Sequence, residues 1–195
     1  SRVHFPVTTL CPGRRLGIWV QGCSIRCPGC ISADTWAQGR GVVEVAELIA
    51  KLKPWLAEAD GITISGGEPF DQPEALQALL ERLRASTRVD VLVYSGHPLE
   101  ALVEYLAHMH GLIDAVITDP FLADASQTLA LRGSDNQRLT ALTPVGAARF
   151  DRFKDDRRQT RALDIVLDED GTLWIAGIPR REDWKNFQAG LNGRG

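Results

Sequence analysis

Three cysteines within eight residues are the part of this sequence most able to do chemistry. Cys23, Cys27 and Cys30 have the spacing C-x3-C-x2-C. Thiolates are the soft ligands that iron–sulfur clusters require. If each thiolate binds one iron of a 4Fe–4S cube, the fourth iron stays open to a second molecule. Pro28 and Gly29 let the loop turn tightly before Cys30, so we predict a cluster site here.

A glycine-containing stretch about forty residues further on is the second candidate. It reads Ser65, Gly66, Gly67, Glu68, Pro69. The two glycines permit close approach of the backbone to a ligand, and carbonyls of this loop would accept hydrogen bonds from an ammonium group. By itself the stretch also fits a strand-to-helix turn, with Glu68 near a helix start where the helix dipole favours a carboxylate. Together with the cysteines it predicts a cofactor-binding loop.

Zinc is the main alternative to a cluster. A structural zinc site normally takes four protein ligands, so Cys11 or His4 would have to be the fourth. Closed zinc sites usually pair two C-x2-C knuckles, and only one is present. We therefore favour the cluster, and we interpret Cys11 as a plain buried or loop thiol.

The elements that must position these loops follow from hydrophobic periodicity. Nearly continuous apolar runs at residues 16–20, 61–65, 89–95 and 112–119 predict strands buried on both faces. Apolar residues at helical spacing in 45–52, 76–83 and 99–106 predict helices between them, and Pro54 should end or kink the first. This alternation predicts an α/β fold with a parallel sheet, which binds ligands at the carboxyl ends of its strands. Both motifs, and a third loop at residues 95–97, follow predicted strands.

The last third of the chain is less regular. Residues 129–133 and 162–168 are interpreted as strands, and a hairpin should join 165–167 to 173–175 through a turn at 168–171. Trp184, Phe187 and Leu191 have the spacing of a last short helix that packs back on the body. Residues 149–161 are locally basic with interleaved aromatics. A solvated face or mobile loop is the first interpretation, and docking of an acidic partner or RNA is the alternative.

Bulk composition limits the classes of function. The chain has 195 residues, 44% hydrophobic and 24% charged, which suits one globular domain. A net charge of -3 argues against nucleic acid or membrane as an electrostatic partner. No apolar run approaches the ~20 residues that span a bilayer. The N-terminus has no apolar signal core, so we expect a cytoplasmic protein.

The motifs together resemble a known family. Residues 23–30, the following Asp34-Thr35-Trp36, and residues 65–69 are similar to the glycyl-radical activating enzymes of the radical S-adenosylmethionine (radical SAM) superfamily, especially the anaerobic ribonucleotide reductase activating proteins. Residues 27–30 match their C-P-G-C, and residues 94–97 and 131–138 resemble two further stretches. The departures are Ile31-Ser32 in place of an aromatic and Asn, residues 118–121 (Thr-Asp-Pro-Phe) in place of D-G-P-F, and the chain beyond residue 162.

The resemblance implies a fold, cofactors and a reaction. The fold would be a partial TIM-type barrel in a single radical SAM domain over residues 1–195, with its core at about 14–140 and a C-terminal extension at 141–195. A 4Fe–4S cluster and S-adenosylmethionine would be the cofactors, and reductive cleavage would yield a 5′-deoxyadenosyl radical. The residues implied are Cys23, Cys27 and Cys30 as cluster ligands, with Gly29, Trp36, Gly66, Gly67, Glu68, Pro69 and Ser95 around S-adenosylmethionine.

Some roles stay open at this point. Trp36 is either a core anchor or a wall of the cofactor pocket. Ser95 either caps a turn or bonds the cofactor's carboxylate, and Arg132 and Arg138 either serve a carboxylate or face solvent. The implied partners are a glycyl-radical enzyme, or another protein or peptide, and a flavodoxin or ferredoxin as electron donor. The alternatives are a small radical SAM enzyme acting on a peptide or small molecule, and a non-catalytic iron–sulfur or zinc binding protein.

Overall fold

The computed structural model describes residues 2–157, 162–167 and 171–192. Its strands are β1 (Arg2–Val7), β2 (Arg15–Val20), β3 (Gly61–Gly66), β4 (Asp90–Tyr94), β5 (Ala115–Thr118), β6 (Arg138–Ala141), β7 (Leu163–Leu167) and β8 (Leu173–Gly177). The first six form one sheet in sequence order, and the last two form a separate hairpin. Strands β2 to β5 are parallel, whereas β1 and β6 run antiparallel to their neighbours at the two edges. The expected α/β class is therefore confirmed.

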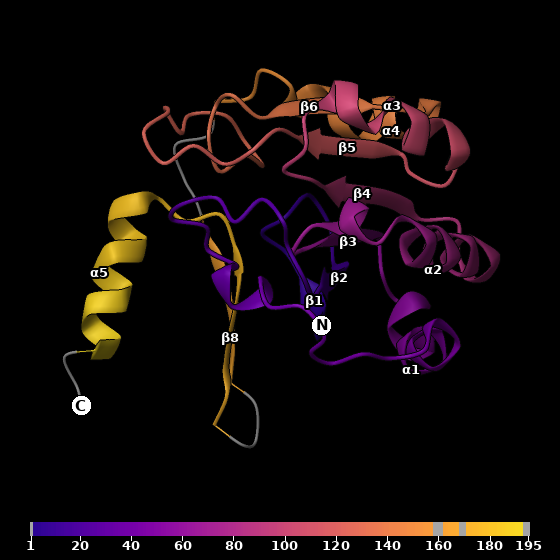
Figure 1. The fold of residues 1–195 in the computed structure, drawn as a ribbon, viewed down its shortest axis with the longest axis horizontal. Coiled ribbons are helices and arrows are strands. Elements are labelled where there is room, and N and C mark those ends of the chain that lie inside the picture. The colour runs from indigo at the N-terminus through magenta and orange to yellow at the C-terminus, as the bar shows by residue number, and fades with distance from the viewer. Residues whose placement is uncertain (1, 158–161, 168–170, 193–195) are drawn as a thin grey trace.

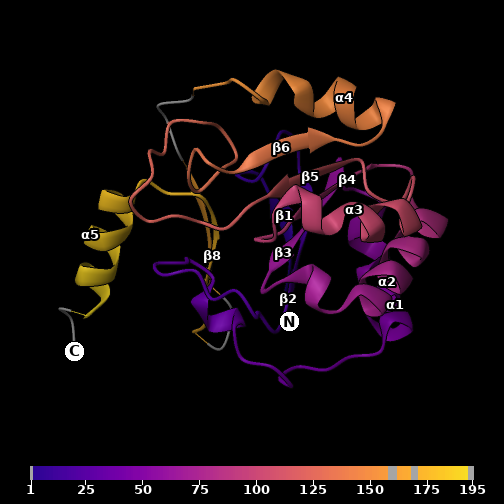
Figure 2. The same cartoon turned by 45° about the horizontal axis from the view of Figure 1, so that its top comes forward.

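Helices cover the sheet on both faces. They are α1 (Val45–Leu56), α2 (Pro73–Ser86), α3 (Leu99–His108), α4 (Pro144–Phe150) and α5 (Arg181–Asn192). Strand alternation separates the two faces, since Val91 and Val93 join the core under α1 to α3 while Leu92 joins a second core with Phe150 of α4. Figure 2 shows α4 on one side of β6 and α1 to α3 on the other.

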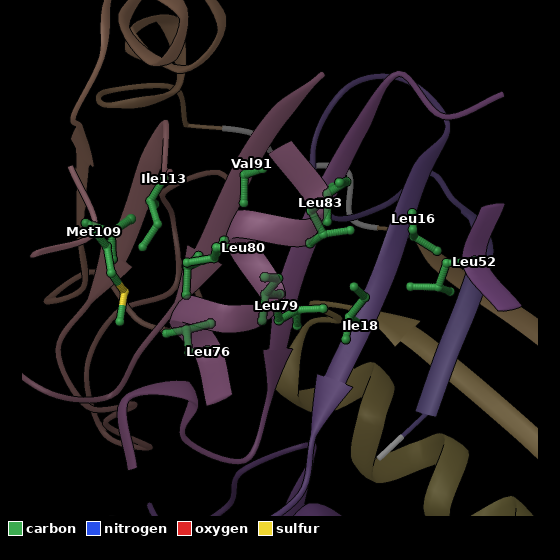
Figure 3. Close-up of a cluster of buried hydrophobic side chains, with 14 of the residues drawn as sticks. Leu16, Ile18, Leu52, Leu76, Leu79, Leu80, Leu83, Val91, Met109 and Ile113 are labelled. Atoms are coloured by element: carbon green, nitrogen blue, oxygen red, sulfur yellow. The ribbon is translucent and has the colours of Figure 1, made fainter. Parts of the chain in front are cut away.

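The larger core lies between the sheet and the predicted helical stripes. Leu16 and Ile18 of β2 point toward Leu52 of α1 and toward the leucines of α2 (Figure 3). All four apolar positions of the α2 stripe are buried: Leu76, Leu79, Leu80 and Leu83. Helical periodicity thus predicted the packing face of α2 correctly, whereas Val103 of the predicted stripe at 99–106 is 59% exposed.

Several predicted elements need correction. Pro54 does not end helix α1, which continues to Leu56, because a proline near a helix end forfeits only one late hydrogen bond. Residues 129–133 form turns instead of a strand, since the backbone N–H groups of Thr128 and Leu129 are bound by the Asp135 carboxylate. Residues 138–141 pair with β5 as the edge strand β6.

The basic stretch at 149–157 belongs to the body of the protein. It contains the end of α4 and a 3-10 turn, and Phe150 and Phe153 are both buried in the second core. The interleaved aromatics therefore serve packing, and they offer nothing to RNA. Residues 158–161 of the predicted stretch, and 168–170 of the predicted hairpin turn, lie outside the described residues.

The sheet stays open between β1 and β6, so no barrel is closed in the described part of the chain. The β7–β8 hairpin and α5 stand at the side of the sheet toward which β4 and β5 point (Figure 1). Both elements were predicted, and both come from the C-terminal extension. Of the helices that the structure describes, none has the length and apolar character needed to cross a membrane.

Candidate active site

The carboxyl ends of β2, β3 and β4 open into one cavity of about 210 Å³. A second hollow, beside β1, has about 10 Å³, which is room for one water. The large cavity brings together nine of the ten residues implied at the sequence level: Cys23, Cys27, Gly29, Cys30, Trp36, Gly66, Gly67, Glu68 and Ser95. Pro69 does not line it and instead begins a buried 3-10 turn.

Short backbone hydrogen bonds hold the cysteine loop in place. The N–H of Gly22 donates to the carbonyl of Thr35 at 2.8 Å, and the N–H of Cys23 donates to the carbonyl of Trp36 at 3.2 Å. Within the loop, the N–H of Cys30 donates to the carbonyl of Cys27 at 3.1 Å, and Gly29 takes a φ of +77°. This left-handed conformation favours glycine, so the tight turn expected from Pro28-Gly29 is present.

The three thiols share a partly buried environment with nearby N–H donors. The backbone N–H of Arg26 donates to the Cys23 sulfur at 3.5 Å. Burial raises the pKa of Cys27 and of Cys30, and hydrogen bonds from the backbones of Phe121 and Ser32 respectively oppose that rise in pKa. The Trp36 side chain also hydrogen-bonds to Cys30. Iron binding requires thiolates. The positive charge of the metal must therefore lower the pKa of these thiols by more than burial raises it.

The two motifs touch each other directly. The N–H of Gly67 donates to the carbonyl of Val20 at 2.9 Å, and the N–H of Glu68 donates to the carbonyl of Gly22 at 2.8 Å. A Cβ at Gly67 would overlap the Gly22 carbonyl oxygen, and Gly66 has a φ of +106°. The approach of the cysteine loop thus requires glycine at position 67, and the close backbone of Val20 requires it at position 66. Neither of these contacts was considered from the sequence, which explained both glycines by the approach of a ligand.

Glu68 joins the loops that follow β3 and β4. Its almost fully buried carboxylate accepts hydrogen bonds from Phe70 N (3.0 Å), Ser95 Oγ (2.9 Å) and Gly96 N (2.7 Å). Burial raises the pKa of Glu68, and these three donors oppose that rise. Ser95 Oγ also accepts from the N–H of His97 at 3.1 Å, so Ser95 caps a turn while it lines the cavity.

Neither candidate for a fourth zinc ligand lines the cavity that the three cysteines face. Cys11 is buried with Leu92 and Phe150, and burial raises its pKa to about 12. The His4 ring lies against Trp174, with ring centroids 5.0 Å apart. Among the residues that the structure describes, no three His, Cys, Asp or Glu side chains converge to hold a single metal ion. A 4Fe–4S cube does not need side chains that converge on one ion, because each thiolate binds its own iron.

Comparison with known proteins decides the family. The family described as "4Fe-4S single cluster domain" matches residues 10–140. The anaerobic ribonucleoside-triphosphate reductase-activating proteins of Salmonella typhi and Escherichia coli (strain K12) are 33% and 32% identical over 135 residues, which cover 65% of this chain and 87% of each relative. The pyruvate formate-lyase-activating enzyme of Listeria monocytogenes is 28% identical over 161 residues, covering 80% of this chain and 63% of the relative.

The chain belongs to the family of glycyl-radical activating enzymes. It is a radical SAM enzyme, and its cofactors are a 4Fe–4S cluster and S-adenosylmethionine. The donor set fits these cofactors, because three soft thiols from one loop line a single cavity.

Two arginines of this activating enzyme bind groups of the protein itself. Arg132 is buried and donates to the carbonyl of Lys154 at 2.8 Å, so it does not face solvent. Arg138 forms ion pairs with Glu100 at 2.6 Å and with Asp119 at 2.7 Å. It therefore fixes the loop that follows β5.

The C-terminal extension supplies cavity walls that sequence reasoning missed. Ile175, Gly177 and Pro179 line the cavity, as do Arg181 and Trp184 of α5. The helical spacing around Trp184 indicated that α5 packs back on the body, yet nothing in that pattern gave its position. Contacts between distant segments hold the chain just before α5 in place, since the Gln127 side chain donates a hydrogen bond to the carbonyl of Pro179 at 2.9 Å.

Proposed function

We propose that this activating enzyme forms a glycyl radical on a partner enzyme, with Cys23, Cys27 and Cys30 as the three cluster ligands. The observation that carries the proposal is the convergence of the three thiols and the Gly66–Gly67 backbone on one cavity at the strand ends. Four further residues that the resemblance implies line the same cavity: Gly29, Trp36, Glu68 and Ser95. In α/β folds this is the edge at which ligands bind.

The protein's own contribution is binding, orientation and exclusion of water. When bound, the cluster and S-adenosylmethionine supply a carbon radical that removes a hydrogen from the substrate. The cysteine loop holds the cluster, Glu68 fixes the two loops beside it, and Gly29, Trp36 and Ser95 complete the cofactor pocket together with residues 66–69. Pro69 supports this loop indirectly, because it begins the buried 3-10 turn that follows Glu68.

The partner, donor and compartment are parts of the same proposal. The named relatives activate an anaerobic ribonucleoside-triphosphate reductase or a pyruvate formate-lyase, so we assign a glycyl-radical enzyme as the partner here. A flavodoxin or ferredoxin serves as electron donor, and the cytoplasm is the compartment. We treat residues 1–195 as one radical SAM domain of partial TIM-barrel type, with its core at about 14–140.

An anaerobic assay tests the proposal in two steps. Reconstituted protein should hold about four irons and four sulfides per chain, and the reduced protein should release methionine and 5′-deoxyadenosine from S-adenosylmethionine. A glycyl radical should then appear by electron paramagnetic resonance on a glycyl-radical enzyme encoded in the same genome. Turnover without any such radical would contradict the activating role while leaving the cofactor chemistry intact.

A further inference from the structure

The β7–β8 hairpin has two faces with different surroundings. Directly opposite residues of an antiparallel pair share a face, so Asp164 lies with Ala176 and Val166 lies with Trp174. The Asp164 carboxylate accepts hydrogen bonds from the backbone and hydroxyl groups of Thr8 and Thr9, at 2.7 to 3.1 Å. This inner face is therefore fixed to the segment between β1 and β2.

The outer face is entirely aliphatic. The same register places five apolar side chains on it: Leu163, Ile165, Leu167, Leu173 and Ile175. Ile165 is 53% exposed, Leu167 is 69% exposed and Leu173 is 37% exposed. A sheet face directed to water normally carries polar residues, and contiguous exposed apolar surface marks interaction sites. We call these five residues the outer strip.

The outer strip is continuous with the cavity that the three cysteines line. Ile175 belongs to the strip and also lines the cavity that the three cysteines face. From there the strip runs along the hairpin to its free end, away from the sheet (Figure 1). A small substrate would occupy only the cavity. A protein that inserts one loop into the cavity must also lie over its rim, where the strip begins.

We propose that the outer strip is the docking surface for the protein that receives the radical. This inference rests on the proposed function, and it commits to a glycyl-radical enzyme that carries an apolar surface beside its target loop. The five strip residues bear no charge, so association through them should depend little on salt. The strip also lies beyond residues 10–140, the part of the chain that matches the family, so it gives this enzyme its own choice of partner.

The test compares two double variants. Ile165→Thr with Leu167→Thr removes apolar surface from the strip, and threonine keeps the β-strand preference. The matched control is Val42→Thr with Val103→Thr, two apolar residues that are 86% and 59% exposed elsewhere on the protein. Binding to a glycyl-radical enzyme from the same genome is measured anaerobically without S-adenosylmethionine. Release of 5′-deoxyadenosine is measured without partner.

We expect the strip variant to bind the partner about tenfold more weakly or worse, with 5′-deoxyadenosine release unchanged. The control variant should match the wild type in both measurements. Unchanged partner binding by the strip variant, equal weakening in the control, or a wild-type dimer that the strip variant dissociates would each overturn the docking assignment. Strip-dependent binding without radical transfer would instead refute the proposed function alone. Radical transfer that is equally efficient in the strip variant and the wild type would refute the docking surface alone.

Discussion

The two edges of the parallel sheet both carry cysteine and charge, yet they differ in what those groups contact. At the carboxyl edge, Cys23, Cys27 and Cys30 face a cavity. At the amino edge, Cys11 lies in an apolar cluster near the buried pair of Arg15, which begins β2, and Asp90, which begins β4. The same residue type thus has a chemical environment at one edge and a packing environment at the other.

The charged groups of the amino edge pair with one another. The fully buried Arg15 pairs with Asp90 at 2.7 Å and donates to Thr63 Oγ1 at 2.7 Å and to the Ile62 carbonyl at 2.6 Å. Arg149 lies 3.3 Å from the second Asp90 oxygen. None of these residues lines either of the two cavities. The difference teaches that a buried polar group indicates function only where its surroundings leave room for a ligand.

Removing one cysteine of the carboxyl edge should have the largest effect. In Cys23→Ala, Cys27→Ala or Cys30→Ala, one iron loses its thiolate, so we expect cluster loss and 5′-deoxyadenosine release at background. Iron and sulfide analysis after anaerobic reconstitution checks this, starting from about four of each per chain. A variant that keeps a full cluster and normal turnover would show that its cysteine is not a ligand.

Gly67→Ala should damage the carboxyl edge through the backbone. A Cβ there overlaps the Gly22 carbonyl oxygen, so the cysteine loop must move, and we expect cluster content as well as S-adenosylmethionine binding to fall about tenfold or more. Gly190→Ala is the control, because a Cβ at that helical position meets nothing within 4 Å. Normal iron content with weakened cofactor binding would return Gly67 to a role in ligand approach alone.

Sequence reasoning located the carboxyl edge better than the amino edge. Cysteine spacing, glycines and strand-terminal position are local signals. Together with the resemblance that these motifs carry, they indicated ten candidate site residues, of which nine line one cavity. The buried pair of Arg15 and Asp90 joins residues 75 positions apart, and no local pattern indicates such a partner. The same holds for β6 and for the wall formed by Ile175 and Trp184, whose places depend on contacts between distant segments.

Asp90→Ala should destabilise the amino edge without changing the chemistry. Arg15 would stay buried without its partner, which typically costs about 3–5 kcal/mol of unfolding free energy. Glu58→Ala is the matched control, since the neighbouring Arg14–Glu58 pair is exposed and should contribute less than about 1 kcal/mol. Thermal unfolding measures both. Turnover per loaded cluster, measured well below the transition, should equal that of the wild type, and a large loss there would connect the two edges functionally.

Cys11→Ala should have the smallest effect, about 1 kcal/mol of unfolding free energy, with cluster and turnover retained.

The pH dependence of the unfolding free energy should distinguish Cys11→Ala from the wild type. Burial raises the pKa of Cys11 from 9.0 to about 12, so the folded protein keeps this proton at a pH where the unfolded chain has lost it. The stabilisation is complete below about pH 9 and is lost toward pH 12, at up to about 1.4 kcal/mol per pH unit. Unfolding of both proteins at pH 8 and pH 10 should therefore show a shallower decline for Cys11→Ala. Parallel declines would mean that this thiol is not buried as the structure has it, and loss of iron would make Cys11 a fourth ligand.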